Sequence, residues 1–334
     1  MIKKLVIVAL SAVFIFAGCG DKGNTGSSSS SGKKKIVVIP KAYDVDFWKV
    51  VHGGTAKAAV ENPKYEIVWQ PPAKNGDSGS QKETMEAMIG SKYDAIAVCP
   101  IDESELVKTI SSAKKAGSKV LVWDSGVKKD DDIETFIATD NYNGGVLCAQ
   151  ALAKSLDNKG TVVMLRYVEG SASTTKREQG FLDTIKKIEG ITYKEINQRG
   201  GDNESTAKKA SENILDANKD VQGVFCPNQT TTEGMLLALK QLNLNGKVKL
   251  VGFDFNPAIE AGIKSGDLYA TAAQNPFGMG YLAVTKSIEV LEGKTIDKRI
   301  DTGVTIITKE NMNSEEMKEI LFPNYNKWIK EHSK

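Results

Sequence analysis

The stretch AIAVCPIDESELVKTISSAKKAGSKVLVW, residues 95–123, contains the pattern that decides the fold. Residues 95–99 and 120–123 are short runs of apolar side chains typical of buried strands. Between them, residues 104–116 place apolar side chains at the spacing of one helix face. A strand, a helix and a second strand in this order predict parallel strands that are covered by helices.

The same alternation continues on both sides of this stretch. Similar tetrapeptides, Ala97-Val98-Cys99-Pro100 and Val224-Phe225-Cys226-Pro227, end an expected strand in each half of the chain, which indicates similar topology in the two halves. We therefore predict an α/β fold of two Rossmann-like lobes, each a parallel sheet flanked by helices, joined by a multi-strand hinge. The other expected strands are 36–39, 67–69, 136–138, 161–165, 193–198, 223–226, 249–253, 270–274 and 304–307, and the other expected helices are 48–60, 81–89, 143–156, 176–188, 205–217, 232–242, 257–264 and 280–291, before an amphipathic tail at 315–329.

The first residues have the composition of an export signal. Lys3 and Lys4 precede an apolar run from Leu5 to Phe16, which is shorter than the roughly 20 residues that a membrane-spanning helix needs. Because Phe16-Ala17-Gly18-Cys19 resembles the bacterial lipobox, residues 1–18 are predicted to be a lipoprotein signal peptide and Cys19 the lipidated residue. An uncleaved anchor, or an ordinary signal with a free Cys19, is the alternative.

The remaining chain divides into a tether and a folded part. Residues 19–34, beginning with the lipidated cysteine, are rich in Ser and Gly and predict a flexible tether. The rest is longer than one hydrophobic core usually serves, so two lobes are expected. We place residues 35–139 plus 275–301 in the N-terminal lobe and residues 140–274 plus 302–334 in the C-terminal lobe.

Composition excludes several function classes. The chain has 44 Lys plus Arg against 42 Asp plus Glu, so no basic excess favours nucleic acid as a partner. Only His52 and His332 are present, which leaves almost no basis for a histidine metal site, and we expect no metal and no cofactor. Besides Cys19, the cysteines Cys99, Cys148 and Cys226 are expected to be buried thiols, with a Cys99–Cys226 disulfide as the alternative.

Polar and aromatic side chains follow the expected strands at their carboxyl ends, where open parallel sheets bind ligands. Planar carboxylate, carboxamide and guanidinium groups can serve sugar hydroxyls with paired hydrogen bonds, and an aromatic ring suits the C–H face of a sugar. The sequence therefore predicts a site for a monosaccharide. The predicted ligand-binding residues are Phe47, Trp48, Asp124, Arg177, Asn228, Asp254 and Gln274, with Lys41 and Asp44 as further candidates.

Each of these residues has a structural alternative. Trp48 opens an expected helix and could belong to the core. Asp124 and Asp254 follow strands, where aspartates commonly cap helices or form turns. Arg177 could pair with Glu178 or Glu169 at the surface.

The motifs agree in order and spacing with a known family, and the chain resembles the periplasmic sugar-binding proteins of the ribose, galactose and xylose group over residues 35–310. In that family the corresponding strand-end residues contact the sugar and the crossover segments form the hinge. The matching segments are Asp46-Phe47-Trp48, Asp124, Thr139-Asp140-Asn141, the Arg177 segment 176–181, Pro227-Asn228, Val251-Gly252-Phe253-Asp254 and the strand segment 270–276.

Some positions depart from the ribose binders. Ser125 stands where they carry a second arginine, Val45 stands where they carry a ligand asparagine, and no aromatic residue occurs at 200–203. Lys41 and the segment 123–126 are more similar to the branch that binds rhamnose or a furanosyl autoinducer. By contrast, the Arg177, Asp254 and Gln274 positions favour a pyranose.

The resemblance implies an extracytoplasmic solute-binding protein, attached to the membrane through its lipid anchor only, that captures a monosaccharide and delivers it to the permease of an ABC importer as a monomer. The alternatives are a receptor for rhamnose or a furanosyl autoinducer and a chemotaxis sugar sensor. A sugar-processing enzyme is not expected, because the sequence contains no phosphate-binding or nucleophile-elbow motif.

Overall fold

The computed structural model describes residues 32–333 of the chain. The predicted signal peptide, Cys19 and most of the predicted tether lie outside the described residues. Within residues 32–333, no helix has both the length and the apolar character that crossing a membrane requires.

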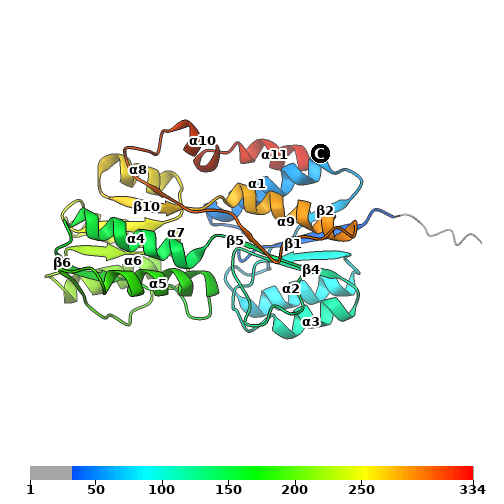
Figure 1. The fold of residues 1–334 in the computed structure, drawn as a ribbon, viewed down its shortest axis with the longest axis horizontal. Helices are drawn as coiled ribbons and strands as arrows, with labels where there is room; N and C mark the ends of the chain where they lie inside the picture. Colours follow the sequence, from blue (N-terminus) through cyan, green and yellow to red (C-terminus); the bar gives the residue numbers. More distant parts are fainter. Residues whose placement is uncertain (1–31, 334) are drawn as a thin grey trace, which may run out of the picture. The chain divides into compact units, whose positions relative to one another are not determined.

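The first lobe is built on a sheet of six strands in the order β11-β5-β4-β3-β1-β2, all paired in parallel. Apolar side chains are buried on both faces of this sheet, as expected for parallel strands covered by helices. Helices α1 (Asp46–Glu61) and α9 (Pro276–Leu291) pack on one face, and α2 (Ser78–Gly90) and α3 (Val107–Lys115) pack on the other (Figure 1). The strands are β1 (Lys35–Ile39), β2 (Glu66–Trp69), β3 (Ala95–Val98), β4 (Lys119–Trp123), β5 (Phe136–Ala138) and β11 (Arg299–Asp301).

The second lobe repeats this topology with the strand order β12-β10-β9-β8-β6-β7. Its pairs are parallel except that β12 is antiparallel to β10. Helices α4 (Asn141–Ser155) and α5 (Ala172–Ile185) pack on one face, and α6 (Glu204–Ala217), α7 (Gln229–Gln241) and α8 (Pro257–Ser265) pack on the other. The strands are β6 (Gly160–Met164), β7 (Ile191–Tyr193), β8 (Gly223–Phe225), β9 (Lys249–Phe253), β10 (Ala270–Ala273) and β12 (Thr305–Ile307). The prediction of two Rossmann-like lobes is confirmed.

The chain passes between the lobes after β5, after β10 and after β11. Two of these crossings are hydrogen bonded to each other. The Thr139 hydroxyl donates to the Gly303 carbonyl at 3.1 Å, and the Asp140 amide donates to the Asp301 carboxylate at 3.1 Å. These two crossings therefore lie side by side as short connecting segments, which is the geometry of a hinge.

The C-terminal tail contacts both lobes. In α10 (Glu315–Leu321), Met317 belongs to the core of the second lobe. By contrast, α11 (Tyr325–His332) packs along α1 of the first lobe (Figure 1). The expected assignment of all residues 302–334 to the second lobe is therefore wrong for α11. The physical reason is packing between distant segments, because α11 lies so close to α1 that a Cβ at Gly53 would come 2.3 Å from Tyr325 Cβ, and the Lys57 ammonium lies 5.6 Å from the centre of the Trp328 ring.

Several helices begin earlier than their apolar spacing predicts, because polar caps add a turn. Asp77 accepts from the Ser80 amide at 2.7 Å and starts α2, and Asn275 accepts from the Gly278 amide at 2.8 Å and starts α9. β7 begins two residues before the expected strand 193–198 and ends at its first residue, Tyr193, and the short edge strand β11 was not predicted. Cys99, Cys148 and Cys226 are buried free thiols, so the Cys99–Cys226 disulfide does not form in this structure.

Candidate functional site

One cavity of about 690 Å³ lies at the carboxyl ends of strands from both sheets. This is the edge at which parallel α/β sheets place ligand-binding loops. The structure brings all of the residues predicted for the site to this cavity: Lys41, Asp44, Phe47, Trp48, Asp124, Arg177, Asn228, Asp254 and Gln274.

Asp124 and Asp254 occupy equivalent places in the two lobes. Asp124 follows β4 with φ of 58°, and Asp254 follows β9 with φ of 72°. This left-handed conformation is uncommon outside glycine, although aspartate is among the residues that tolerate it. Neither residue is a helix N-cap, since β4 is followed by β5 and since α7 and α8 are capped by Asn228 and Asn256, so the capping alternative is wrong and the turn alternative holds for the backbone of both residues. Both carboxylates are buried beside the cavity.

Asp254 is the centre of a hydrogen-bonded group in the second lobe. One carboxylate oxygen accepts from the Gln229 amide at 2.8 Å, and the other accepts from Gln274 Nε2 at 2.7 Å. Burial raises the pKa of Asp254 above its ordinary value, while the Arg177 guanidinium opposes that rise. Gln274 Oε1 is buried and has no hydrogen-bond partner among the described residues, which is uncommon for a buried carbonyl oxygen.

Arg177 is 3% exposed and is held in one orientation from three sides. Its Nε donates to Asn141 Oδ1 at 2.7 Å, and its Nη1 donates to the Pro227 carbonyl at 3.0 Å. Its guanidinium carbon lies 3.8 Å from the centre of the Phe253 ring. The guanidinium is thus fixed at the cavity wall, and the alternative of a surface pair with Glu178 or Glu169 is wrong.

Asn228 and Gln229 begin α7 at the cavity. Asn228 Oδ1 accepts from the Thr231 amide at 3.2 Å as the helix cap, which leaves its amide nitrogen available to a ligand. Gln229 was not predicted from the sequence, yet it contacts the other lobe. Its Oε1 accepts from the Phe47 amide at 3.3 Å.

Phe47 and Trp48 start α1 and form an edge-to-face pair with centroids 4.9 Å apart. Trp48 also packs edge-on against Trp123, with centroids 5.8 Å apart, in the core of the first lobe. Trp48 therefore belongs to the core, as the alternative expected, and it also lines the cavity, while its contact with a ligand stays a prediction. The pair gives the first lobe an aromatic wall.

Lys41 and Asp44 lie toward the rim. Lys41 Nζ donates to the Ser171 hydroxyl of the other lobe at 3.3 Å, and Asp44 is exposed. Further contacts join the lobes around the cavity: the Glu103 amide donates to the Gly170 carbonyl at 3.0 Å, and the Ser173 amide donates to the Ser125 hydroxyl at 3.3 Å. The lobes therefore meet at several points around the mouth of the cavity.

Several lining residues were missed by the sequence analysis. Tyr167 follows the end of β6, so the strand-end rule that selected Asp124 could have selected it as well. Glu233 lies one helical turn beyond Gln229, and its carboxylate accepts a hydrogen bond from Asn256 Nδ2 at 2.5 Å. Burial raises the pKa of Glu233 above its ordinary value. Other lining residues are Asp46, Asn75, Asp102, Glu169, Ser173, Thr174, Asp202, Asn203, Glu204 and Thr230.

The comparisons with known proteins agree with this geometry. Residues 36–295 match the family described as "Periplasmic binding protein domain", and the chain belongs to this family. It is 29% identical over 315 residues to the ribose import binding protein RbsB of Bacillus subtilis, which covers 92% of this chain and 100% of that protein.

Solved structures with bound sugars have the same fold. An ABC transporter solute-binding protein from Agrobacterium vitis with bound D-fucose is 32% identical, with a TM-score of 0.83, and the match covers 86% of this chain and all of that one. A second from the same organism, bound to alpha-D-tagatopyranose, is 29% identical with a TM-score of 0.82, covering 86% of this chain and 99% of that one. The resemblance to periplasmic sugar-binding proteins is therefore confirmed. The family consists of binding proteins rather than enzymes, and it works outside the cytoplasm.

Proposed function

We propose that this protein is a lipid-anchored, extracytoplasmic solute-binding protein that captures a neutral monosaccharide and delivers it to an ABC importer. One observation carries the proposal. Carboxylate, carboxamide and guanidinium groups from both lobes line a single cavity together with the Phe47–Trp48 wall. These groups match a polyhydroxylated ring, whose hydroxyls donate and accept at once and whose C–H face is apolar.

The charge of the cavity supports a neutral sugar. Lys41 and Arg177 are the only cationic side chains among its described lining residues. A carboxylate or phosphate on the ligand would meet like charge, which costs affinity. The carboxylates that line the cavity are Asp44, Asp46, Asp102, Asp124, Glu169, Asp202, Glu204, Glu233 and Asp254.

The relatives support the ligand class. The names of similar proteins mention ribose, D-fucose and alpha-D-tagatopyranose, which are all neutral monosaccharides. Ser125 and the absence of an aromatic residue at 200–203 disfavour ribose itself. A hexose or deoxyhexose pyranose is therefore the proposed ligand, and rhamnose or a furanosyl signal is the alternative.

Binding would close the lobes by population shift. Ligand contacts from both lobes stabilise the closed arrangement relative to the open one, and the permease would respond to the closed form. Contacts such as Phe47 to Gln229 and Lys41 to Ser171 are formed between the lobes and would be absent when they separate.

The sugar assignment is tested by calorimetry on residues 33–334, which form one compact unit. The panel contains neutral pentoses, hexoses and deoxyhexoses, with glucuronate and ribose 5-phosphate as anionic controls, and an amino acid and a nucleoside as other classes. We expect micromolar or tighter binding of a neutral sugar and much weaker binding of the anions. Binding of the amino acid or nucleoside with no sugar bound would overturn the assignment.

The lipid anchor is tested separately by metabolic labelling with palmitate in a bacterial host. We expect the full chain to incorporate label and to partition with membranes, and Cys19→Ser to do neither. Cys148→Ser, which changes a buried thiol, is the matched control. Label that persists in Cys19→Ser would exclude this cysteine as the lipidated residue.

A further inference from the structure

Among the described residues that line the cavity, Tyr167 is the one aromatic residue from the second lobe. Phe47 and Trp48 line it from the first lobe, so aromatic surface is available from both lobes. Tyr167 is partly buried, and burial raises the pKa of its phenol, with further contributions from the carboxylates of Asp202 and Asp254. Both carboxylates line the same cavity, so the phenol lies among the polar groups of the site.

The backbone of Tyr167 is held on both sides by charged side chains. Its amide donates to Glu178 Oε1 at 3.0 Å, and its carbonyl accepts from Arg199 Nη1 at 2.9 Å. Hydrogen bonds to charged groups are among the stronger ones in proteins. Glu178 is 6% exposed and belongs to α5, whereas Arg199 follows β7, so two separate elements fix this one residue.

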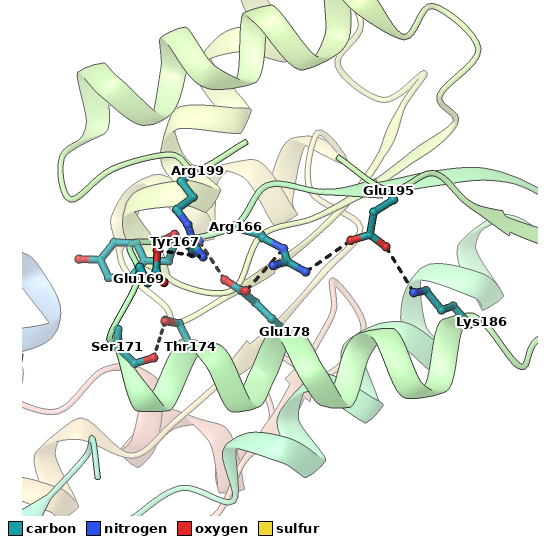
Figure 2. Close-up of polar contacts among 9 residues, drawn as sticks. All are labelled: Arg166, Tyr167, Glu169, Ser171, Thr174, Glu178, Lys186, Glu195 and Arg199. Atoms are coloured by element: carbon teal, nitrogen blue, oxygen red, sulfur yellow. Dashed lines mark hydrogen bonds and ion pairs between the residues drawn. The ribbon is translucent and has the colours of Figure 1, made fainter. Parts of the chain in front are cut away.

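Further charges hold Glu178 in turn. Figure 2 shows a chain of contacts that runs from Lys186 through Glu195 and Arg166 to Glu178 and the Tyr167 backbone. Arg166 Nε lies 3.8 Å from Glu178 Oε2, which is an ion-pair distance but too long for a hydrogen bond.

The main chain reinforces this arrangement. The Gly200 amide donates to the Arg166 carbonyl at 2.8 Å, and Arg166 and Arg199 form an isolated parallel bridge. The segment that carries Tyr167 is therefore bonded through its main chain and through side chains. Only Glu178 of this network is buried, and its buried charge is satisfied by the Tyr167 amide and by Arg166, which can fix one conformation of the segment.

We propose that Tyr167 is a specificity-determining contact for the sugar, and that Glu178 and Arg199 are positioning residues that hold its ring at the cavity wall. This inference rests on the proposed function for its ligand class. An aromatic ring fixed in advance contributes its contact at little cost in conformational freedom. The ring would cover an apolar face of the sugar from the second lobe, while the Phe47–Trp48 wall serves the first.

The ring is tested with the sugar that binds tightest in the panel above. Tyr167→Ala is expected to weaken its binding about tenfold or more, whereas Tyr167→Phe, which keeps the ring, retains most of the affinity. The preference for this sugar over its epimers should fall in Tyr167→Ala. Tyr142→Ala, at a tyrosine of α4 that is 42% exposed and does not line the cavity, is the matched control and should bind as the unchanged protein does.

The positioning role is tested by a double-mutant cycle. Glu178→Ala alone is expected to weaken sugar binding several-fold. Added to Tyr167→Ala, the same change should weaken binding hardly at all, because Glu178 acts through the Tyr167 ring. Glu178→Gln keeps an acceptor for the Tyr167 amide and should restore most of the loss. An equal loss in both backgrounds would overturn the positioning role. If Glu178→Ala does not unfold cooperatively, Arg199→Met replaces it in the same cycle.

The outcomes separate this inference from the proposed function. If no sugar binds the unchanged protein, the proposed function fails. If a sugar binds and Tyr167→Ala binds it with the same affinity and the same preference among epimers, the proposed function stands and the role of Tyr167 is wrong.

Discussion

The two lobes place a carboxylate at the same point of the same topology, yet they surround it differently. The Asp124 amide donates to the Ile137 carbonyl and the Asp254 amide to the Ala272 carbonyl, each at 2.8 Å. The side-chain partner of Asp124 is the Cys99 thiol at 3.2 Å, beside the aromatic core of the first lobe.

Asp254 instead belongs to a polar group with Gln229, Gln274 and the nearby Arg177 charge. The comparison shows that one fold can be duplicated while its strand ends diverge in chemistry. The first lobe contributes the aromatic pair Phe47 and Trp48 beside polar side chains that include Asp124, and the second contributes the hydrogen-bonded group around Asp254. The following experiments test this division.

The largest effect is expected at the paired helices of each lobe. A Cβ at Gly54 of α1 would lie 1.9 Å from the Phe277 carbonyl oxygen, and a Cβ at Gly145 of α4 would lie 2.0 Å from the Arg177 carbonyl oxygen. Each Gly→Ala change should therefore lower the free energy of unfolding by about 3 kcal/mol. Only Gly145→Ala should also weaken sugar binding, because it displaces Arg177.

Urea unfolding and calorimetry measure the two effects. Gly90→Ala is the control, since a Cβ there meets nothing within 4 Å. An equal loss of affinity in Gly54→Ala would contradict the division between the lobes.

The next effect separates the two aspartates. Asp254→Asn should weaken sugar binding about 100-fold, because it removes the charge that faces the buried Arg177 and disturbs the Gln229 and Gln274 hydrogen bonds. Asp124→Asn should weaken sugar binding only about tenfold, because the Asp124 side chain has the Cys99 thiol as its single partner. Titration of both variants with the same sugar checks the order, and a larger loss at Asp124 would reverse our assignment of the polar half.

A smaller effect is expected on the stability of the protein when the pH falls. His52 is half buried on the first lobe and stacks on Trp69 with centroids 4.9 Å apart. Burial and the nearby His332 charge lower the pKa of His52 from 6.5 to about 4. The folded chain therefore binds fewer protons than the unfolded chain, and stability from this group is lost as the pH falls from about 6.5 to about 4.

His52→Phe should remove this loss, which we place at about 2 kcal/mol after allowing for partial exposure. The second lobe should show the opposite trend. The pKa values of Asp254, Glu178 and Glu233 are raised by burial, so their contribution to stability falls as the pH rises above their ordinary values. Urea unfolding between pH 4 and 7 compares the His52→Phe variant with the unchanged protein. Identical dependence of the unfolding free energy on pH in the two would rule out His52 as the sensitive group.

The smallest effect is expected at the rim. Lys41→Met removes a contact of 3.3 Å to the Ser171 hydroxyl at a partly exposed position. Such contacts contribute little, so sugar affinity should change less than about threefold. A tenfold loss in the same titration would show that Lys41 contacts the sugar directly.

The sequence predicted the lobes and the residues that line the cavity because both depend on local rules. Strand-helix alternation defines parallel sheets, and the residue after each strand faces the ligand edge. The same rule also selects Tyr167, which follows β6 as Asp124 follows β4, although the prediction named only Arg177 of the next helix. Gln229 was missed because its place at the cavity depends on the Asn228 cap, which starts α7 a turn earlier than its apolar spacing indicates.

Contacts between distant segments could not be read from local patterns. Arg177 and Glu178 are adjacent in α5, and adjacent helical residues point in different directions. Arg177 therefore reaches the cavity, while Glu178 meets Arg166 and the Tyr167 amide behind it. The position of α11 on the first lobe likewise depends on packing against α1, which apolar spacing within the tail does not reveal.

The first lobe is built from chain segments that are far apart in the sequence, and this affects the order in which the lobes fold. Its sheet ends in β11 and one of its faces is covered by α9, so it draws on segments that are synthesised after most of the second lobe. The second lobe lies mainly in one continuous stretch between these parts. A chain that emerges from its N-terminus can therefore pair β6 to β10 of the second lobe early and add its edge strand β12 and α10 last, while the first lobe must wait for α9, which covers one face of its sheet, and exposes apolar strands in the meantime.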